Sequence, residues 1–361
     1  MIRVAINGYG RIGRVAHRII IEKFGDQIEV VAVNAGASTD MKGWMYLLQY
    51  DTTYRPLQHH SIFIQKPEEV TIKTSLPVIG GLVIDDKVVP FYSERDPSQL
   101  PWRDLNVDVV IESTGAFTTQ DKIQPHIDAG AKTVILSAPF KDEESGSTYV
   151  LGVNLAENEG DKLENVISNA SCTTNCIAPV AAIMHETFGI EKAMMTTIHG
   201  YTSDQSLQDG GHKDYRRARA AAQNIIPTSS GATIAAAKAI PELQGIFNGL
   251  AIRVPVPVGS LSDFTFLLKR ETTVEEVNNA LKQASENPRW KGIFTITNDP
   301  IVSSDIIGNS HSSIADLALT QVVGGNMVKV IAWYDNEFGY SNRLVEETLI
   351  LGHKAQRNPQ N

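Results

Sequence analysis

The residues best suited to covalent chemistry are two cysteines spaced about one helical turn apart. Cys172 and Cys176 are the only cysteines of the 361-residue chain, and they lie in a segment with helical character, residues 171–188. A thiol at a helix N-terminus has its thiolate stabilised by the helix dipole. Two cysteines are too few for a disulfide scaffold in a chain of this size, and two ligands cannot complete a zinc site. The pattern therefore indicates a reactive thiol, and no metal site is expected.

His199 is the best candidate for a base that would activate this thiol. It lies in the sequence MTTIHGYT, near the end of a strand-like run at residues 193–201. A histidine next to a nucleophilic thiol accepts its proton and increases its reactivity. A single histidine is more often a packed or surface residue, so the residue types alone leave both interpretations open.

A glycine-rich turn near the N-terminus predicts a nucleotide site. Gly8, Gly10 and Gly13 form a G-x-G-x-x-G pattern that follows a short apolar run, residues 2–7, and opens a helical stretch, residues 12–24. The first glycine permits a tight turn, the second lets a pyrophosphate approach the backbone, and the third lets helix and strand pack closely. Free N–H groups at the helix N-terminus would bind the phosphates. The alternative is a glycine turn with a purely structural role.

The end of the next strand-like run bears on which dinucleotide is bound. A carboxylate about 20 residues after the glycines ordinarily binds the ribose 2′-hydroxyl. Here the run ends in Asn34 and Ala35, and no carboxylate follows until Asp40. The missing charge removes a repulsion toward a 2′-phosphate, and Ser38 and Thr39 offer hydrogen-bond donors. We therefore expect NADP, or both NADP and NAD, to be used; the alternative is that Asp40 binds the ribose and NAD is preferred.

The first half of the chain has the pattern of an α/β fold. Apolar strand-like runs at residues 2–7, 29–34, 107–112 and 132–137 alternate with helical stretches at 12–24 and 120–129. This order is typical of a parallel sheet with helical crossovers. Residues 71–90 instead predict a strand pair, with turns at the paired glycines 80–81 and the paired aspartates 85–86.

The second half predicts a different architecture. Longer strand-like runs lie at residues 193–201, 249–256, 263–269 and 327–334, and a capping-box pattern opens a helix at 273–285. Long strands with few intervening helices indicate a mixed or antiparallel sheet with helices on one face. A closing helix is expected at 341–352, before a frayed tail at 354–361. The predicted fold class is thus α/β: a Rossmann-type dinucleotide-binding domain plus an α+β catalytic domain with a large mixed sheet.

Composition disfavours several kinds of partner. The formal net charge is −9, and an acidic surface repels nucleic acid and anionic lipid. No apolar run approaches the roughly 18 residues that a membrane span needs, and the N-terminal sequence lacks the features of a secretory signal, so we expect a cytoplasmic protein. The basic run at residues 212–219 is explained either by local ion pairs or by a role at a phosphate or subunit contact.

Several segments together resemble the glyceraldehyde-3-phosphate dehydrogenase family. In chain order they are NGYGRIGR at 7–14, SERDP at 93–97, ESTGAF at 112–117, SNASCTTNC at 168–176, TTIHGYT at 196–202, HKDYRRARAAAQNIIPTSSGA at 212–232, RVPVP at 253–257 and WYDNEFGYS at 333–341. The resemblance runs nearly from end to end, and SNASCTTNC followed by TTxHxYT is highly specific. It implies the reversible, phosphate-dependent oxidation of glyceraldehyde 3-phosphate to 1,3-bisphosphoglycerate, a step of glycolysis and gluconeogenesis.

The resemblance also implies roles for individual residues. Cys172 would attack the aldehyde, His199 would take the proton, and inorganic phosphate would cleave the thioester left after hydride transfer. The residues implied in the phosphate sites are Thr202 and Arg253 for the substrate, and Ser171, Thr173, Ser230 and Gly231 for inorganic phosphate. Those implied at the cofactor, besides the three glycines and Ala35, are Arg11, Ile12, Arg95, Ser137, Asn336 and Tyr340, the last two near the nicotinamide.

Domain organisation and assembly follow from the same resemblance. The dinucleotide-binding domain would cover residues 1–170 and the catalytic domain residues 171–337, with a closing segment, 338–361, returning to the first domain. A homotetramer is implied, in which residues 202–219 lie near the cofactor of a neighbouring subunit. The expected partners are a phosphorylated aldehyde, inorganic phosphate and further copies of the chain, with no nucleic acid and no membrane.

Some positions depart from the family pattern, and two rival functions stay open. Ala35 replaces the usual acidic residue, Phe338 replaces a common tryptophan, and residues 61–78 look like extra length. One rival is erythrose-4-phosphate dehydrogenase, which the phosphate-site segment PTSSGA at 227–232 disfavours. The other is a catalytically inert nucleotide-binding protein on the same scaffold, which the intact Cys172 and His199 disfavour.

Overall fold

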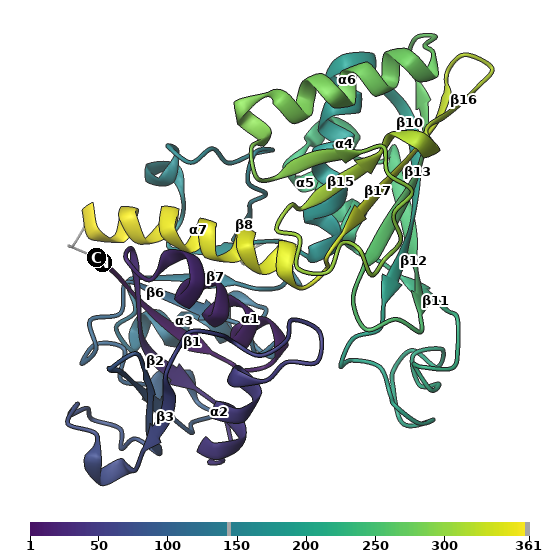
Figure 1. The fold of residues 1–361 in the computed structure, drawn as a ribbon. Coiled ribbons are helices and arrows are strands. Elements are labelled where there is room, and N and C mark those ends of the chain that lie inside the picture. Colours follow the sequence, from purple (N-terminus) through teal and green to yellow (C-terminus); the bar gives the residue numbers. More distant parts are fainter. Residues whose placement is uncertain (143–145, 358–361) are drawn as a thin grey trace. The chain divides into compact units, whose positions relative to one another are not determined.

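The structure is a computed structural model that describes residues 1–142 and 146–357 (Figure 1). The chain divides into two compact units. The first comprises Met1–Thr148, Glu157–Asn169 and the segment from Ser341 onward, and the second comprises Tyr149–Ala156 and Ala170–Tyr340. The short segment Tyr149–Ala156 differs from the sequence-based division, which placed it in the first domain. It belongs with the second unit, where the carbonyl oxygen of Gly152 accepts a 2.6 Å hydrogen bond from Arg289 Nε.

The described residues of the first unit form a nine-stranded sheet in the order β3-β4-β5-β2-β1-β6-β7-β9-β8. Its strands are β1 (Ile2–Asn7), β2 (Ile28–Asn34), β3 (Ile62–Gln65), β4 (Gly80–Ile84), β5 (Lys87–Tyr92), β6 (Val109–Glu112), β7 (Thr133–Leu136), β8 (Ser147–Thr148) and β9 (Val166–Ser168). Its helices are α1 (Arg11–Ile19), α2 (Met41–Gln49), α3 (Gln120–Asp128) and most of α7 (Phe338–Arg357). β1 pairs in parallel with β2 on one side and β6 on the other, which confirms the Rossmann-type arrangement.

The central strands are apolar along their whole length because both faces of the sheet are covered. Val4, Ala5 and Ile6 of β1 are completely buried, and so is every residue of β6. Strands buried on both faces give continuous apolar runs rather than alternation. This is why the short runs in the sequence predicted parallel strands. In an open parallel sheet of this kind, ligands bind at the carboxyl ends of the strands.

The predicted strand pair at 71–90 forms with one difference. β4 and β5 make an antiparallel hairpin, whose turn residues Asp85 and Asp86 both have positive φ, as a two-residue hairpin turn requires. The predicted turn at Gly80 is wrong, because Gly80 begins β4. A Cβ atom at Gly80 would lie 2.9 Å from the carbonyl oxygen of Gln65, so the glycine permits close approach of β3. The segment with extra length thus contributes β3, an edge strand of the sheet.

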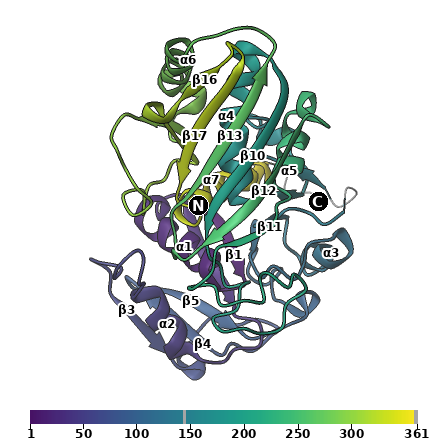
Figure 2. The same ribbon diagram turned by 90° about the vertical axis from the view of Figure 1, so that its right-hand side faces the viewer.

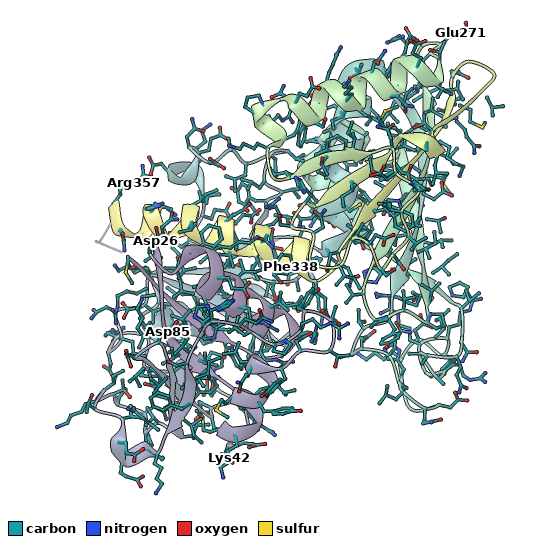
Figure 3. The ribbon with its side chains drawn as sticks, viewed as in Figure 1. Asp26, Lys42, Asp85, Glu271, Phe338 and Arg357 are labelled. Atoms are coloured by element: carbon teal, nitrogen blue, oxygen red, sulfur yellow. The ribbon has the colours of Figure 1, made fainter. Side chains whose placement is uncertain are left out.

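Two helices differ in length from their predictions. The helix expected at 12–24 forms as α1 and continues into a π-helical turn, Ile20–Phe24. The closing helix α7 is longer than 341–352, and Figure 3 labels its end residues, Phe338 and Arg357. The fraying expected from residue 354 is wrong as far as residue 357, because Lys354 donates a hydrogen bond to Asn165. The remaining tail, residues 358–361, lies outside the described residues.

The second unit is built on a mixed sheet in the order β11-β12-β10-β13-β17-β15-β14, with β16 added to β17. Its strands are β10 (Ile190–Gly200), β11 (Ile226–Ser229), β12 (Phe247–Val254), β13 (Ser260–Leu268), β14 (Phe294–Thr297), β15 (Ser313–Asp316), β16 (Gln321–Val323) and β17 (Met327–Tyr334). Its helices are α4 (Cys172–Phe188), α5 (Ala232–Ala239) and α6 (Val274–Glu286). Figure 2 shows β17, β13, β10 and β12 side by side with α4 and α5 behind them. The predicted mixed sheet with helices on one face is confirmed.

Candidate active site

Cys172 is the first residue of α4, as the sequence predicts. The preceding residue, Ser171, caps the helix, since its Oγ atom accepts a 3.0 Å hydrogen bond from the backbone N–H of Thr174. Ala170 has φ of +53°, a left-handed conformation that is uncommon for a residue with a Cβ atom. Tyr340 stabilises this turn, because its hydroxyl donates a 3.2 Å hydrogen bond to the carbonyl oxygen of Ala170. The turn presents the Cys172 side chain at the positive end of α4.

The structure brings the predicted nucleophile and base together. The Sγ atom of Cys172 lies 3.4 Å from Nε2 of His199, which stands near the end of β10 and is almost fully buried. The other ring nitrogen, Nδ1, lies 2.6 Å from the carbonyl oxygen of Gly200. Nε2 is the ring nitrogen that faces the thiol, at a distance suited to accepting its proton, which is the geometry that general-base activation needs.

Burial controls the protonation of both groups. It raises the pKa of the Cys172 thiol, against the opposing effects of the Arg253 charge and a hydrogen bond from Thr173. It also lowers the pKa of His199 to about 3, and the Arg253 charge acts in the same direction. Burial therefore favours the neutral form of both groups, and the Arg253 charge opposes this effect only at Cys172.

Cys176 has a different environment from Cys172. It is completely buried, and its Sγ atom lies 3.8 Å from the hydroxyl oxygens of Ser262 and Ser313. Burial raises its pKa to about 12. The second cysteine is therefore a packed, unreactive thiol in the helix interior.

Tyr334 joins this centre although sequence reasoning gave it no role. Its hydroxyl oxygen lies 3.0 Å from Oγ1 of Thr173 and 2.7 Å from Oγ1 of Thr197, and its ring packs edge-on against His199 with centroids 5.9 Å apart. A buried tyrosine at the end of a strand is ordinarily a core residue. Only the pairing of β13 with both β10 and β17 reveals that this one lies beside His199.

The residues implied for inorganic phosphate gather at two helix N-termini. Ser171 and Thr173 belong to the start of α4, and Gly231 caps α5, where the Ser230 hydroxyl accepts a hydrogen bond from the backbone. The hydroxyl of Thr174 donates a 3.4 Å hydrogen bond to the carbonyl oxygen of Ala232 at the start of α5. A Cβ atom at Gly231 would meet no atom within 4 Å. Two helix N-termini beside open space form a setting that favours an anion.

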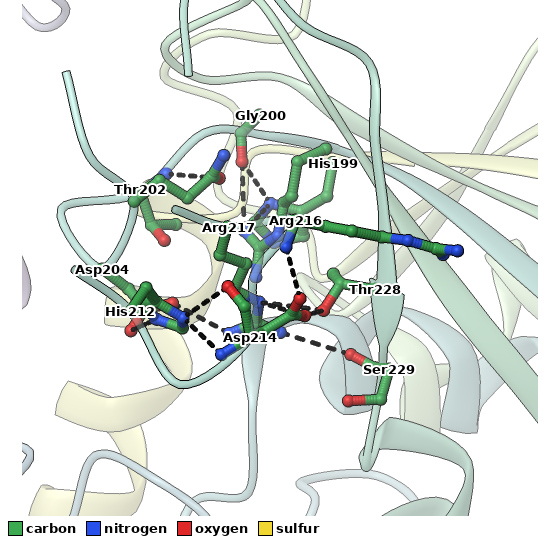
Figure 4. Close-up of polar contacts among 12 residues, drawn as sticks. His199, Gly200, Thr202, Asp204, His212, Asp214, Arg216, Arg217, Thr228 and Ser229 are labelled. Atoms are coloured by element: carbon green, nitrogen blue, oxygen red, sulfur yellow. Dashed lines mark hydrogen bonds and ion pairs between the residues drawn. The ribbon is translucent and has the colours of Figure 1, made fainter. Parts of the chain in front are cut away.

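Arg253, implied for the substrate phosphate, lies beside His199 because β12 pairs in parallel with β10 in that register. Its Nη1 atom is 2.7 Å from Nδ1 of His199 and donates a 3.1 Å hydrogen bond to the carbonyl oxygen of Gly200. Its Nε atom is buried without a partner, so the guanidinium keeps donor capacity for an anion. Thr202, the other implied residue, follows β10, and Figure 4 shows it with His199 and Gly200.

The glycine turn of the first unit fits a dinucleotide pyrophosphate. Gly8 has φ of +95°, and a Cβ atom there would lie 2.6 Å from the backbone nitrogen of Thr114. A Cβ atom at Gly13 would lie 2.2 Å from the carbonyl oxygen of Gly8. At Gly10 it would meet no atom within 4 Å, so this position faces open space at the N-terminus of α1. The three glycines therefore have the three roles that a Rossmann turn requires.

Comparison with known proteins decides the family. A family model described as the NAD binding domain of glyceraldehyde 3-phosphate dehydrogenase matches residues 2–120, and one described as the C-terminal domain of the same enzyme matches residues 171–336. The chain belongs to the glyceraldehyde-3-phosphate dehydrogenase family. It is therefore an oxidoreductase with a nucleotide-binding Rossmann domain.

Full-length relatives support the same assignment to the glyceraldehyde-3-phosphate dehydrogenase family. The chain is 49% identical over 353 residues to glyceraldehyde-3-phosphate dehydrogenase 2 of Streptomyces avermitilis, an alignment that covers 98% of this chain and 99% of the relative. It is 48% identical over 355 residues to the glyceraldehyde-3-phosphate dehydrogenase of Mycolicibacterium smegmatis, covering 97% and 98%. The enzyme of that name from Priestia megaterium is 49% identical over 355 residues, covering 98% and 99%.

Ala35, the position expected to face the ribose in this dehydrogenase, has no carboxylate, as the sequence shows. Asp40 instead caps α2, where its Oδ1 atom accepts a 2.9 Å hydrogen bond from the N–H of Gly43. The hydroxyl oxygen of Ser38 accepts a 3.0 Å hydrogen bond from Trp44 Nε1. Both side chains therefore have structural roles around α2, although the hydroxyl hydrogen of Ser38 is left to donate.

The other residues implied at the cofactor are divided between the two units. Arg11, Ile12, Arg95 and Ser137 belong to the first unit, and Asn336 and Tyr340 to the second. Arg11 forms an ion pair with Asp51, the Arg95 side chain is exposed, and Ser137 follows β7. Asn336 is buried and accepts a 2.9 Å hydrogen bond from Ser260.

The basic run at 212–219 is partly neutralised by ion pairs within its own loop. Arg217 and His212 both pair with Asp204, and Arg219 pairs with Asp209. Asp214 accepts a hydrogen bond from Thr228 of β11, and Figure 4 shows this contact together with those of Asp204. The described part of this dehydrogenase contains no cluster of three or more potential metal-ligating side chains. None of its described helices is both long and apolar enough to cross a membrane.

Proposed function

We propose that the chain is a phosphorylating glyceraldehyde-3-phosphate dehydrogenase that oxidises D-glyceraldehyde 3-phosphate to 1,3-bisphosphoglycerate, reversibly, with NAD(P) and inorganic phosphate. The observation that carries the proposal is the placement of Cys172 at the N-terminus of α4, 3.4 Å from Nε2 of His199, in a chain of this family. A thiol with an adjacent base suits covalent catalysis on a carbonyl carbon.

In the first half-reaction, the thiol of Cys172 attacks the aldehyde carbon. Nε2 of His199 accepts the thiol proton, and its N–H then donates to the oxygen of the resulting thiohemiacetal. The glycine turn of Gly8, Gly10 and Gly13 would hold the dinucleotide, which would supply the hydride acceptor for this carbon. The proton stays on His199, so the negatively charged oxygen can re-form a carbonyl as the hydride leaves. The product is a thioester on Cys172.

In the second half-reaction, an oxygen of inorganic phosphate attacks the thioester carbonyl. The C–S bond breaks, an acyl phosphate is released, and the sulfur leaves as a thiolate that regains the proton held on Nε2 of His199. The paired N-termini of α4 and α5 would hold the attacking phosphate, with Ser171, Thr173, Ser230 and Gly231 as its ligands. Arg253 and Thr202 would hold the phosphate of the substrate, since a guanidinium can bind a phosphate with two parallel hydrogen bonds.

The cofactor proposed is NADP, or NADP and NAD together. Ala35 offers no negative charge to repel a 2′-phosphate, and the Asp40 carboxylate is engaged at the N-terminus of α2. Arg95 presents an exposed cation in the same unit.

A homotetramer is proposed as the assembly. The sheet of the second unit has helices on one face only, and its other face exposes Met194 (62%) and Leu250 (42%). The loop after β10 exposes Leu207 (81%) and Tyr215 (87%). Large exposed apolar side chains on a loop and a sheet face favour contact with further copies of the chain. Light scattering on the purified protein would give the mass of the assembly directly.

The activity is tested by following dinucleotide reduction with glyceraldehyde 3-phosphate, with and without inorganic phosphate. We expect turnover that depends on phosphate, and a loss of about 10² to 10⁴ in kcat for His199→Asn. Dinucleotide binding by that variant, measured by calorimetry, should match the wild type. Equal turnover with and without phosphate would contradict the proposal. Faster turnover of erythrose 4-phosphate than of glyceraldehyde 3-phosphate would show that the proposed substrate is wrong.

A further inference from the structure

Three buried hydroxyl groups form a chain that begins at the proposed inorganic phosphate site. Thr173 Oγ1 lies 3.0 Å from Tyr334 Oη, which lies 2.7 Å from Thr197 Oγ1. Thr197 Oγ1 in turn donates a 3.1 Å hydrogen bond to the carbonyl oxygen of Leu261. All three hydroxyl residues are at least 94% buried, with exposed fractions of 6%, 1% and 0% in the order given. The chain is thus closed to solvent at every position except its Thr173 end.

The far end of the chain fixes the direction of every hydrogen bond in it. A carbonyl oxygen can only accept, so the single hydrogen of Thr197 is used there. Thr197 must then accept from Tyr334, whose own single hydrogen is used in that bond. Tyr334 must consequently accept from Thr173. Burial holds the pKa of Tyr334 well above its usual range, so the phenol keeps the hydrogen that this order requires.

The consequence appears at Thr173. Its hydrogen points inward to Tyr334, so only its lone pairs face outward. We propose that Tyr334 makes Thr173 a hydrogen-bond acceptor at the inorganic phosphate site, and so selects an oxyanion that carries a hydrogen. This inference rests on the proposed function, because that function assigns Thr173 to the site.

The direction of the hydrogen bonds among these hydroxyl groups is best defined at the step that consumes phosphate. While Cys172 is a thiolate, its sulfur competes for the Thr173 hydrogen, because Thr173 also hydrogen-bonds to that group. Once the sulfur is acylated it carries no negative charge, and Tyr334 is the stronger acceptor. Thr173 therefore faces the incoming oxyanion as an acceptor at the moment of attack on the thioester.

Phosphate and sulfate differ in the property that such an acceptor detects. At neutral pH inorganic phosphate retains at least one P–OH hydrogen, which it can donate to Thr173. Sulfate has no hydrogen, so its oxygens would meet the lone pairs of Thr173 and both groups would stay unpaired. A site built to bind a hydroxyl rejects an analogue that lacks it, because the buried polar group is left without a partner. Tyr334 would thus be a positioning residue for oxyanion selectivity.

The test compares phosphate as substrate with sulfate as competitive inhibitor. The measured quantity is the ratio of the sulfate inhibition constant to the phosphate KM, in the wild type and in Tyr334→Phe. Removing the phenol hydroxyl frees the Thr173 hydrogen to point outward, where it favours both oxyanions. We expect the ratio to fall about tenfold, which corresponds to about 1.4 kcal/mol.

A second variant reaches the same state by another route. Thr197→Val removes the acceptor of the Tyr334 hydrogen, so Tyr334 must donate to Thr173, which then donates outward. We expect the same fall in the ratio. The matched control is Tyr92→Phe, which removes the hydroxyl of a buried tyrosine 3.1 Å from Thr74 in the first unit and should leave the ratio unchanged.

A double-variant experiment separates orientation from general structural damage. In a Thr173→Val background, Tyr334→Phe should change the ratio no further, because the group that it orients is absent. An unchanged ratio in both Tyr334→Phe and Thr197→Val, or an equal fall in the Thr173→Val background, would overturn the inference. If the wild type needs no phosphate at all, the proposed function fails instead, and the two failures are distinguishable.

Discussion

Arg253 places Nη1 2.7 Å from Nδ1 of His199, the ring nitrogen that does not face Cys172. The parallel register of β10 and β12 sets this proximity. A positive charge beside the imidazole disfavours its protonation, and Arg253 lowers the pKa of His199 in addition to burial. The same charge opposes the burial that raises the pKa of Cys172. One guanidinium thus favours the neutral form of His199 and the ionised form of Cys172.

Arg253→Met should therefore shift both groups in a predictable direction. Without the positive charge the pKa of Cys172 rises further, so alkylation of the thiol by iodoacetamide should reach half of its maximal rate at a higher pH. The KM for the phosphorylated aldehyde should also rise, by about tenfold or more, through loss of a charge-assisted hydrogen bond. Stopped-flow alkylation across pH 6–10 gives the midpoint. Arg253→Lys keeps the charge and serves as control; a midpoint shared by all three proteins would show that Arg253 does not influence the thiol.

The two cysteines should differ clearly in reactivity. Cys172→Ser should abolish phosphate-dependent aldehyde oxidation, whereas Cys176→Ser should keep most of it, because Cys176 is buried with a pKa of about 12. Limited alkylation followed by peptide mass spectrometry should find the adduct on Cys172. Dinucleotide binding serves as a folding control for both variants. Comparable activity losses in the two variants would remove the assignment of the nucleophile.

The sequence alone was sufficient to predict the helices and strands that have a clear local pattern. The apolar run at residues 2–7 and the capping box before α6 predicted β1 and the start of α6 correctly, because both signals are local. Tyr334 could not be recognised in this way, because its role depends on strand pairing between residues far apart in the chain. Gly80 was misread for the same reason, since what it accommodates is the backbone of another strand. At such positions, contacts with segments far away in the sequence determine the role of a residue, and its type alone does not reveal that role.

A buried histidine in the first unit should make stability depend on pH. His17 is almost fully buried, its Nδ1 atom lies 2.7 Å from the Tyr9 hydroxyl, and burial lowers its pKa to about 3. Between that value and about 6.5, the unfolded chain binds a proton that the folded chain does not, so stability falls as pH falls through this range. The expected contribution is about 1.4 kcal/mol for each pH unit within the window.

Thermal unfolding of His17→Gln at several pH values checks this contribution. Gln cannot take up a proton, so the melting temperature of the variant should fall less steeply than that of the wild type between pH 6.5 and pH 4, although it will be lower at neutral pH. His353→Gln, which replaces an exposed histidine of α7, is the control and should keep the wild-type slope. Equal slopes in the wild type and His17→Gln would mean that His17 is not the group that titrates.

The cofactor prediction depends on a missing charge. Because Ala35, the residue after β2, has no carboxylate and Asp40 is held at the N-terminus of α2, we expect kcat/KM with NADP at least equal to that with NAD. Ala35→Asp should shift the preference toward NAD, since a carboxylate accepts hydrogen bonds from the ribose hydroxyls and repels a 2′-phosphate. A net change of about 1.4 kcal/mol already alters the ratio of the two kcat/KM values tenfold. Steady-state kinetics with both dinucleotides give that ratio, and Ala35→Asn is the control that adds similar bulk without charge. Strong NAD selectivity in the wild type would mean that another group holds the ribose hydroxyls, and Asp40→Asn would then show whether Asp40 is that group.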